Sequence, residues 1–473
     1  MDKNRRAFLK LTGLLGTGFA GGALQGFTAV STVETDRPLV QRKQFSGQQF
    51  NMCGYAAPKL DTVRIGYVGL GNRGSAAVPR MIHIDGISIN ALCDIRQQQA
   101  ETAKEMLKGT PFHPALYYGK EDAWKKLCER DDIDLVYIAT PWDLHAPIAT
   151  YAMNHGKHVA VEVPAANTLD ECWEMVEASE RNKRHCVILE NCCYDFFELL
   201  TLNMARQGFF GEIVHGAGAY LHYTAPSFFD KKARYNLWRL RENAHRDGNL
   251  YPTHGLGPVC QIMNINRGDK MDYLVSMSSN DFTMHELAKE AAAKDKDFLP
   301  FVNSPFIGNM NTSTIRTRLG RTILLQHDVS TPRPYSRIHQ ISGTKAIAVK
   351  YPEPGRIATG DKDWAGEAEM KQYEEKYTLP VVVRMGEMAR QVGGHGGMDF
   401  LMDWRLIDCL RNGLPMDHDV YDAALWSAIA PLSEWSVAHR SNSIDVPDFT
   451  RGAWEKNSPV NISIEHGNLT TVK

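Results

Sequence analysis

The sequence predicts an α/β protein of two domains, the first with a doubly wound parallel sheet and the second with an antiparallel sheet. A glycine-rich turn follows the first clear strand, and strands then alternate with helices up to about residue 190. Beyond about residue 212, short strands follow one another without regular helices between them. The length of 473 residues suits two domains, which we expect at 61–190 and 191–473.

The N-terminus predicts an export signal. An arginine pair at residues 5–6 precedes an apolar, glycine-rich stretch that runs to residue 27, and small residues follow. This order is typical of secretory signals, and the arginine pair resembles the twin-arginine type. We expect a signal at 1–31, a polar linker at 32–60 and a periplasmic or otherwise exported protein, with an uncleaved anchor as the alternative. No later stretch has the roughly 20 apolar residues of a membrane span, so we expect none in the mature chain.

Residues 63–74 predict a strand that leads into a phosphate-binding turn. The run Val63–Val68 is rich in β-branched residues, and a G-x-G-x-x-G pattern follows it. Its first glycine permits a tight turn, its second lets the backbone approach a diphosphate, and its third lets the helix pack on the strand. A helix from about residue 75 would offer its free N–H groups to the phosphates. The residues of this predicted cofactor site are Gly69, Gly71, Asn72, Arg73 and Gly74.

A second predicted strand, 87–93, ends in Asp94, which stands twenty positions after Gly74. A carboxylate at that place accepts hydrogen bonds from the ribose hydroxyls of NAD, whereas a nearby arginine suits the 2′-phosphate of NADP. Arg96 keeps NADP open as the alternative, but Asp94 favours NAD. The first domain is therefore expected to be a Rossmann domain that binds NAD.

The alternation continues with strands at 133–139, 158–162 and 186–189 and with helices at about 120–130 and 169–184. Ligands of such a sheet bind at the carboxyl ends of its strands. Further cofactor-binding candidates at these ends are Trp142, His145, Glu162 and Asn191.

The second half has a different pattern. Strands are predicted at 213–221, 274–278, 314–319, 321–328 and 337–341, which suits an antiparallel sheet. The charged segments 284–296 and 362–376 are helix-prone, and apolar residues recur at helical spacing between 398 and 440.

Composition excludes some functions. The formal net charge of −2 offers no basic footprint for nucleic acid, so an enzyme acting on a small molecule is favoured. No set of His, Asp or Glu residues has metal-ligand spacing, so no metal is expected. His395 stands among glycines, and either a ligand contact or the need for tight backbone turns explains that loop.

The sequence resembles the Gfo/Idh/MocA oxidoreductase superfamily over roughly residues 60–430. The resemblance rests on the fingerprint 63–74, on Ala139-Thr140-Pro141 with His145, and on Glu162-Val163-Pro164. It implies that the second domain is an α/β domain with a large, mainly antiparallel open sheet, and such sheets often pair to form a homodimer. Dehydrogenases of the superfamily usually read Glu-Lys-Pro, and that lysine helps to move the alcohol proton. Val163 cannot transfer a proton, so a simple dehydrogenase is disfavoured.

The Glu-Val-Pro version resembles glycoside hydrolase family 109, an NAD-dependent branch whose known activity is α-N-acetylgalactosaminidase. Segments 190–194, 251–255 and 393–400 are similar to that branch. The resemblance implies a hydrolase that cleaves a terminal sugar from a small carbohydrate or glycan. Its mechanism is oxidation at C3, elimination, water addition and reduction, with no net redox. A periplasmic NAD(P)-dependent sugar oxidoreductase is the alternative, and a non-enzymatic sugar- or nucleotide-binding protein is the third hypothesis.

This chemistry needs one group for the 3-hydroxyl proton and a base near C2. We expect His254 in the first role, because a histidine titrates near working pH. Tyr194 is the expected C2 base, and Glu162 is expected near the ribose and the substrate hydroxyls. The expected substrate-binding residues are Tyr220, Arg239, Tyr251, His254 and Tyr335.

Overall fold

The computed structural model describes residues 47–462 and 470–473. The predicted signal and most of the predicted linker lie outside the described residues. The described part of that linker, 47–60, contacts the C-terminal half: the Leu60 N–H donates to the Leu410 carbonyl at 3.1 Å, and Met52 is buried. Among the described residues, no helix is long and apolar enough to cross a membrane.

The first sheet is parallel and has six strands in the order β3-β2-β1-β4-β5-β6 within the described residues. Its β-branched strands are buried, as a sheet covered on both faces requires. This confirms the predicted doubly wound sheet. The strands are β1 (Val63–Val68), β2 (Ile87–Cys93), β3 (Ala115–Tyr117), β4 (Leu135–Ile138), β5 (His158–Val161) and β6 (Cys186–Ile188).

Helices connect these strands. Helix α2 begins directly in the glycine-rich turn, three residues earlier than predicted, and α6 begins at a capping box in which Thr168 and Glu171 bond each other's backbone N–H. Helices α5 and α6 pack on each other. The helices are α2 (Asn72–Met81), α3 (Gln97–Glu105), α4 (Ala123–Cys128), α5 (His145–Asn154) and α6 (Leu169–Asn182).

The second sheet has eight strands in the order β13-β12-β11-β7-β10-β9-β8-β14 in the part of the chain that the structure describes. Strands β7 and β10 pair in parallel, and the other neighbouring strands of this sheet pair antiparallel, which confirms the mainly antiparallel open sheet. The strands are β7 (Ile213–Leu221), β8 (Met271–Ser278), β9 (Asn311–Thr317), β10 (Thr322–Asp328), β11 (Gln340–Gly343), β12 (Ala346–Val349), β13 (Arg356–Thr359) and β14 (Ile444–Asp445).

Strand β11 begins at Gln340 rather than at 337 as predicted, because Ile338 (φ 64°) and His339 (φ 33°) adopt left-handed backbone conformations that interrupt a strand. Helices also occur between the strands of this half. The helix-prone segments and the helical spacing of the sequence predict α10 (Met284–Lys294), α11 (Glu367–Tyr377), α13 (Met398–Asn412) and α14 (Val420–Ala438). The sequence pattern does not predict α7 (Phe196–Arg206), α8 (Trp238–His245), α9 (Thr253–Ile262) and α12 (Pro380–Val392).

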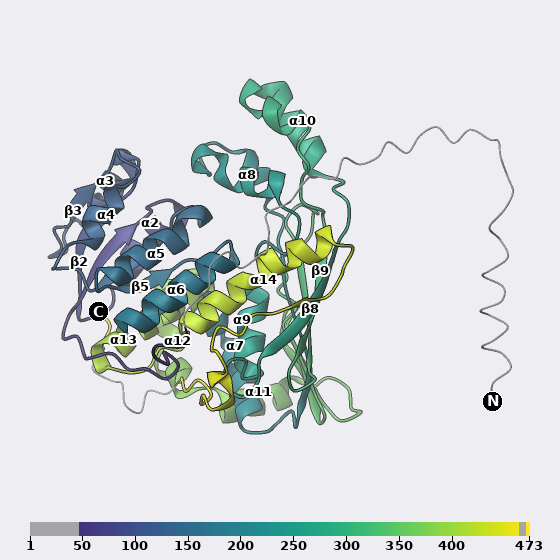
Figure 1. Cartoon of the computed structure of the whole chain (residues 1–473). Helices are drawn as coiled ribbons and strands as arrows, with labels where there is room; N and C mark the ends of the chain where they lie inside the picture. The colour runs from purple at the N-terminus through teal and green to yellow at the C-terminus, as the bar shows by residue number, and fades with distance from the viewer. Residues whose placement is uncertain (1–46, 463–469) are drawn as a thin grey trace, which may run out of the picture. The chain divides into compact units, whose positions relative to one another are not determined.

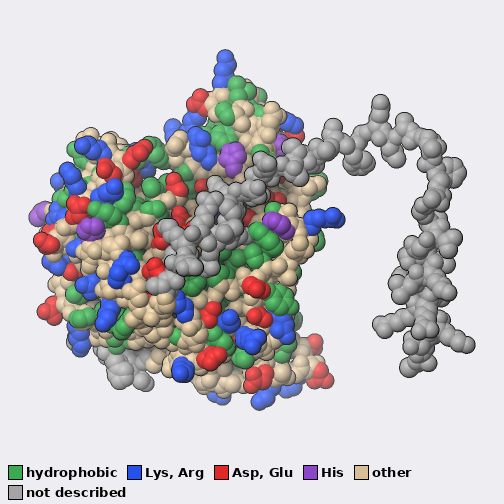
Figure 2. All heavy atoms as spheres, in the orientation of Figure 1, with side chains coloured by type: hydrophobic (Ala, Val, Ile, Leu, Met, Phe, Trp, Pro, Cys, Tyr) green, Lys and Arg blue, Asp and Glu red, His purple; other side chains and the backbone are tan. Residues whose placement is uncertain are grey.

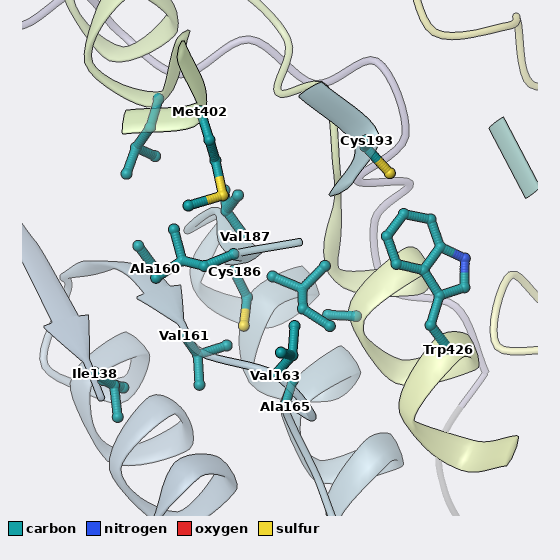
Figure 3. Packing of buried hydrophobic residues seen from close by; sticks show 14 of the residues in the cluster. Ile138, Ala160, Val161, Val163, Ala165, Cys186, Val187, Cys193, Met402 and Trp426 are labelled. Atoms are coloured by element: carbon teal, nitrogen blue, oxygen red, sulfur yellow. The ribbon is translucent and has the colours of Figure 1, made fainter. Parts of the chain in front are cut away.

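The last two helices return to the first sheet. Helix α13 contacts β1 and α2, and α14 contacts α6 and β6 (Figure 1). Figure 3 shows Val161 and Val163 of the first sheet region in the same apolar cluster as Met402 of α13 and Trp426 of α14. The two halves of the chain therefore share one core. On the face drawn in Figure 2, acidic and basic side chains are interspersed rather than segregated.

Candidate functional site

A cavity of about 540 Å³ lies along the carboxyl ends of β1, β2, β4 and β5, a size typical of cofactor and small-molecule sites. One wall comes from the first sheet, where Gly69, Asp94 and Glu162 line it. The opposite wall contains Arg239 and Tyr251 from the second half. The cavity thus brings together the carboxyl-end edge of the doubly wound sheet and two of the predicted substrate residues, Arg239 and Tyr251.

The glycines of the turn fit a diphosphate. A Cβ at Gly69 (φ 89°) would come within 2.6 Å of the Ala139 backbone, and one at Gly74 within 1.8 Å of the Gly69 carbonyl oxygen. A Cβ at Gly71 would meet only the Arg96 guanidinium, at 3.8 Å, so it would occupy open cavity space. Helix α2 has no side-chain cap and no acidic residue in its first turn, so its N-terminal N–H groups can bind an anion.

Asp94 fixes this turn from the end of β2. Its Oδ2 accepts the Leu70 N–H at 2.8 Å, and its Oδ1 accepts from the Arg96 backbone N–H at 2.9 Å and from Arg96 Nε at 3.1 Å. The Arg96 guanidinium also lies 5.1 Å from the centre of the Tyr235 ring across the cavity. The carboxylate that favours NAD and the arginine that would favour NADP are therefore direct partners.

Glu162 belongs to a charged network at the end of β5. Its Oε1 accepts from Arg73 Nε at 2.8 Å, while Nη1 of Arg73 donates to Asp399 Oδ2 at 3.0 Å. Burial alone would raise the pKa of Asp399, but the hydrogen bond from His395 and the charges of Arg73 and Arg80 hold it well below its usual range. The network ties the glycine-rich turn to α13.

Two predicted cofactor residues hold other protein groups. The ring nitrogens of His145 lie 2.7 Å from the Pro164 carbonyl and 2.8 Å from the Thr140 carbonyl, so this buried imidazole bridges two loops of the cavity wall. Burial lowers the pKa of His145. Asn191 donates to Asp399 Oδ1 at 2.6 Å and lies outside the cavity lining.

Arg239 lies between aromatic rings on the cavity wall. Its guanidinium is 4.7 Å from the centre of the Trp142 ring and 4.8 Å from that of Tyr251. Its Nε is buried and has no hydrogen-bond partner within the described residues. Burial and the like charge of Arg239 both lower the pKa of the neighbouring Arg234. Unsatisfied buried donors of this kind are suited to a polar ligand.

The other predicted substrate residues cluster behind Tyr251. Gly218 of β7 and Gly255 of α9 are in contact: a Cβ on Gly218 would lie 2.2 Å from the Gly255 carbonyl oxygen. Because of this close approach, the centre of the Tyr220 ring lies 4.6 Å from the centre of the Tyr251 ring and 5.5 Å from that of the His254 ring. Tyr335 belongs to the same cluster, with its ring centre 6.3 Å from that of Tyr220.

His254 pairs with a buried carboxylate that the sequence reasoning did not assign. Its Nδ1 lies 2.7 Å and 3.0 Å from the two carboxylate oxygens of Glu190. Burial opposes ionisation of Glu190, but the charge and hydrogen bond of His254 lower its pKa to about 2. Glu190 therefore stays ionised and fixes the His254 ring with Nε2 available for another partner.

Glu190, Cys192 and His254 place possible metal-ligand atoms within 4.8 Å of one another, a grouping that the sequence spacing did not predict. Burial and neighbouring carboxylates raise the pKa of Cys192 well above its usual range, which keeps it a neutral thiol. Within this group Glu190 and His254 are hydrogen-bonded to each other.

Tyr194, the expected C2 base, lies outside the cavity lining. Its hydroxyl donates to Asp417 at 3.0 Å, and burial together with the Asp417 charge raises its pKa well above its usual range. A phenol outside the cavity whose hydroxyl is bound by Asp417 is poorly placed to take a proton from the sugar, so this geometry does not favour Tyr194 in that role.

Comparison with known proteins identifies the family. Residues 194–456 match the family model "Glycosyl hydrolase 109, C-terminal domain". The chain is 47% identical over 457 residues to "Glycosyl hydrolase family 109 protein 1" of Bacteroides fragilis (strain YCH46), covering 93% of this chain and 96% of the relative. The chain belongs to glycosyl hydrolase family 109.

Other similarities agree with the family 109 assignment. Residues 63–189 match the model "Oxidoreductase family, NAD-binding Rossmann fold". An "Alpha-N-acetylgalactosaminidase" of Bacteroides fragilis is 47% identical over 413 residues, covering 86% of this chain and 96% of the relative. The solved structure "Levoglucosan dehydrogenase, complex with NADH" has a TM-score of 0.60 at 18% identity, covering 82% of this chain and 100% of that chain, and shares the Gfo/Idh/MocA fold. Family 109 membership supports a glycosidase acting on a carbohydrate.

Sequence reasoning missed three members of this family 109 site: Glu190, Asp399 and Arg80. Arg80 binds Asp403 through Nη2 at 2.9 Å and approaches Asp399 at 3.6 Å. The segments 190–194 and 393–400 resemble family 109, but the sequence pattern assigns no role to their acidic residues. The partners of Glu190 and Arg80 are distant in sequence, so spacing alone carries no signal for these pairs, whereas Asp399 has one local partner, His395, four residues before it.

Proposed function

We propose that this family 109 protein is an exported glycosidase that removes terminal α-linked N-acetylgalactosamine with the help of bound NAD. One observation carries the proposal: a single cavity has a diphosphate cradle at one end and Arg239 and Tyr251 at the other, with the His254–Glu190 pair behind them. The similarity to a protein named alpha-N-acetylgalactosaminidase supports the choice of sugar.

Bound NAD would supply a hydride acceptor for C3 of the sugar and return the hydride at the end, so that no net redox occurs. The residues that would hold it are the turn at Gly71, the N-terminus of α2 and Asp94. The cradle at Gly71 fits this group, because its missing side chain leaves space beside free N–H groups.

His254 is the residue that we assign to the 3-hydroxyl proton. Its Nδ1 is held by Glu190, so Nε2 can accept the proton and the buried carboxylate stabilises the imidazolium that results. Val163 lines the cavity where dehydrogenases of the superfamily usually have lysine, and its side chain is unable to take this role. Proton handling is therefore assigned to the second half of the chain.

Tyr251 is the residue that we assign to the C2 proton in place of Tyr194. Two tyrosines line the cavity within the described residues, and the other, Tyr235, lies on Arg96 at the cradle end. Burial raises the pKa of Tyr251 well above its usual range, while the Arg239 charge lowers it. Tyr251 is preferred to Tyr194 because Tyr251 lines the cavity and Tyr194 does not.

The decisive experiment incubates the full chain with 4-nitrophenyl α-N-acetylgalactosaminide in D₂O. We expect nitrophenol release, deuterium at C2 and no net NADH. Steady NADH formation without nitrophenol would instead indicate the sugar oxidoreductase, and retained cofactor without either reaction would indicate a binding protein. His254→Ala should abolish turnover, and His215→Ala is the matched control, because His215 lies at the far end of β7 against Thr322.

The export part of the proposal rests on the N-terminal pattern and is tested separately. Residues 1–31 fused to a folded reporter should deliver it outside the cytoplasm. Replacement of Arg5 and Arg6 by lysine should retain the reporter inside, while a control change in the linker should not.

A further inference from the structure

The glycine-rich loop 393–397 holds a histidine whose role the proposed function leaves open. Five successive residues have positive φ angles, and His395 (φ 48°) is the one that is not glycine. The left-handed conformation costs a non-glycine residue about 1–2 kcal/mol, so it persists where the surroundings hold it. The exposed fraction of the His395 side chain is 58%, which leaves it accessible to a ligand.

One ring nitrogen holds His395 in place. Its Nδ1 lies 2.9 Å from Asp399 Oδ2 and 3.3 Å from Arg73 Nη1. A protonated Nδ1 donates to Asp399, and an unprotonated Nδ1 accepts from Arg73. Nδ1 thus has a partner in either tautomer, and neither contact uses Nε2. A histidine with this arrangement can give and take a proton at Nε2 without losing its anchor.

His395 lies outside the cavity lining but is joined to it through Arg73, which is part of that lining. Arg73 contacts both His395 and Glu162, which lines the cavity. On the opposite side, burial lowers the pKa of His222, and the charges of Arg239, His254 and His395 add to this effect. Nδ1 of His222 is hydrogen-bonded to the hydroxyl of Tyr220 at 3.1 Å. The charged and titratable groups that face His395 are thus Arg73 from α2, Asp399 from α13 and His222 after β7.

We propose that His395 is the acid and base at the glycosidic oxygen, an inference that rests on the proposed function. When the C2 proton has left, its electron pair forms the C1=C2 bond, and the C1–O bond breaks toward the glycosidic oxygen. That oxygen takes the proton from Nε2 of the His395 imidazolium, whose Nδ1 keeps its own proton on Asp399, and the alcohol departs. Water then adds to C1, giving its proton to Nε2, while C2 regains a proton. Bonds and protons balance, and His395 ends in its starting state.

The test uses two substrates that differ in their need for an acid. A sugar or alkyl alkoxide leaves poorly without protonation, whereas 4-nitrophenolate leaves readily. The variant is His395→Asn, because asparagine tolerates positive φ. The control is His285→Asn: His285 forms a similar histidine–aspartate pair with Asp281 at 2.6 Å, four residues apart, on α10 away from the cavity lining.

We expect His395→Asn to lower kcat/KM for an alkyl α-N-acetylgalactosaminide by about 100-fold or more, but that for the 4-nitrophenyl glycoside by less than about threefold. Exchange of the C2 hydrogen with D₂O should continue on the alkyl glycoside, and bound NAD content should match that of the wild type. In the smaller variant His395→Gly, added imidazole should recover cleavage of the alkyl glycoside. The His285→Asn control should resemble the wild type.

Equal losses on both substrates, or no loss on either, would overturn the role of His395 while leaving the proposed function intact. Failure of imidazole to rescue His395→Gly would also count against it. If the wild type cleaves neither glycoside, the proposed function itself fails, so the two failures are distinguishable.

Discussion

Gly71 and Gly74 belong to the same turn, yet a methyl group at each position meets different surroundings. At Gly74 the added Cβ would lie 1.8 Å from the Gly69 carbonyl oxygen, a backbone atom that is fixed against β4. At Gly71 its nearest neighbour would be the Arg96 guanidinium at 3.8 Å, and φ of −72° suits alanine. We therefore expect Gly74→Ala to impair folding and Gly71→Ala to impair NAD binding.

The magnitudes follow from these contacts. Gly74→Ala should lower the free energy of unfolding of the cofactor-free protein by about 2–3 kcal/mol, because helix and turn must move apart. Gly71→Ala should change it by less than about 1 kcal/mol, since a small loss at the N-cap offsets reduced freedom of the unfolded chain. Its methyl group would occupy diphosphate space and weaken NAD binding by about 100-fold, or ~2.7 kcal/mol.

Two measurements separate these outcomes: denaturant unfolding of cofactor-free protein, and calorimetric titration with NAD. At 100 times the wild-type Kd, NAD should stabilise the wild type by about 2.7 kcal/mol and Gly71→Ala by less than about 0.5 kcal/mol. Wild-type NAD affinity in Gly71→Ala would refute the reasoning, because the diphosphate would then lie elsewhere. Undiminished stability of Gly74→Ala would refute the packing argument.

Three further outcomes are expected. The pKa of Glu190 is lowered from 4.5 to about 2, so the charge of this carboxylate stabilises the fold above pH 4.5. Glu190→Gln should therefore lower the free energy of unfolding at pH 7 by up to about 3 kcal/mol in denaturant titrations. The difference between variant and wild type should disappear as the pH falls to 2. Burial and the charge of Asp195 raise the pKa of Glu198 from 4.5 to about 7, so wild-type stability should fall between those pH values, and Glu198→Gln should flatten that slope. Arg96→Ala should weaken NADP binding more than NAD binding in paired titrations, because Asp94 keeps its bond to the Leu70 N–H.

The first sheet could be predicted from the sequence because its signals are local. Each strand is a short buried run next to a turn, and the glycine pattern specifies the first crossover. The second sheet was predicted less completely. Strands β12 and β13 have four residues each and alternate weakly, and the two-residue β14 is defined by its pairing with β8. Such pairing is non-local and leaves no local pattern.

The site residues also divide into those that could be predicted from nearby sequence and those that depend on distant partners. Asp94 and the glycines act through neighbours in the chain, so their roles follow from spacing. The role of Tyr194 depends on Asp417, which is 223 positions away and removes its hydroxyl from the cavity. His254 was selected from the sequence, but its partner Glu190 is 64 positions distant and became visible only in the structure.

In the proposed function, position 163 connects these observations. Val163 packs into the apolar cluster that the first sheet shares with α13 and α14, so a lysine there would place its stem in that cluster (Figure 3). The residues that we assign to proton transfer instead come from α9 and from the loop before α13. Both are anchored by carboxylates, Glu190 for His254 and Asp399 for His395. Cofactor binding and proton transfer therefore reside on different parts of the chain, so changes at His254 or His395 should alter turnover without releasing NAD.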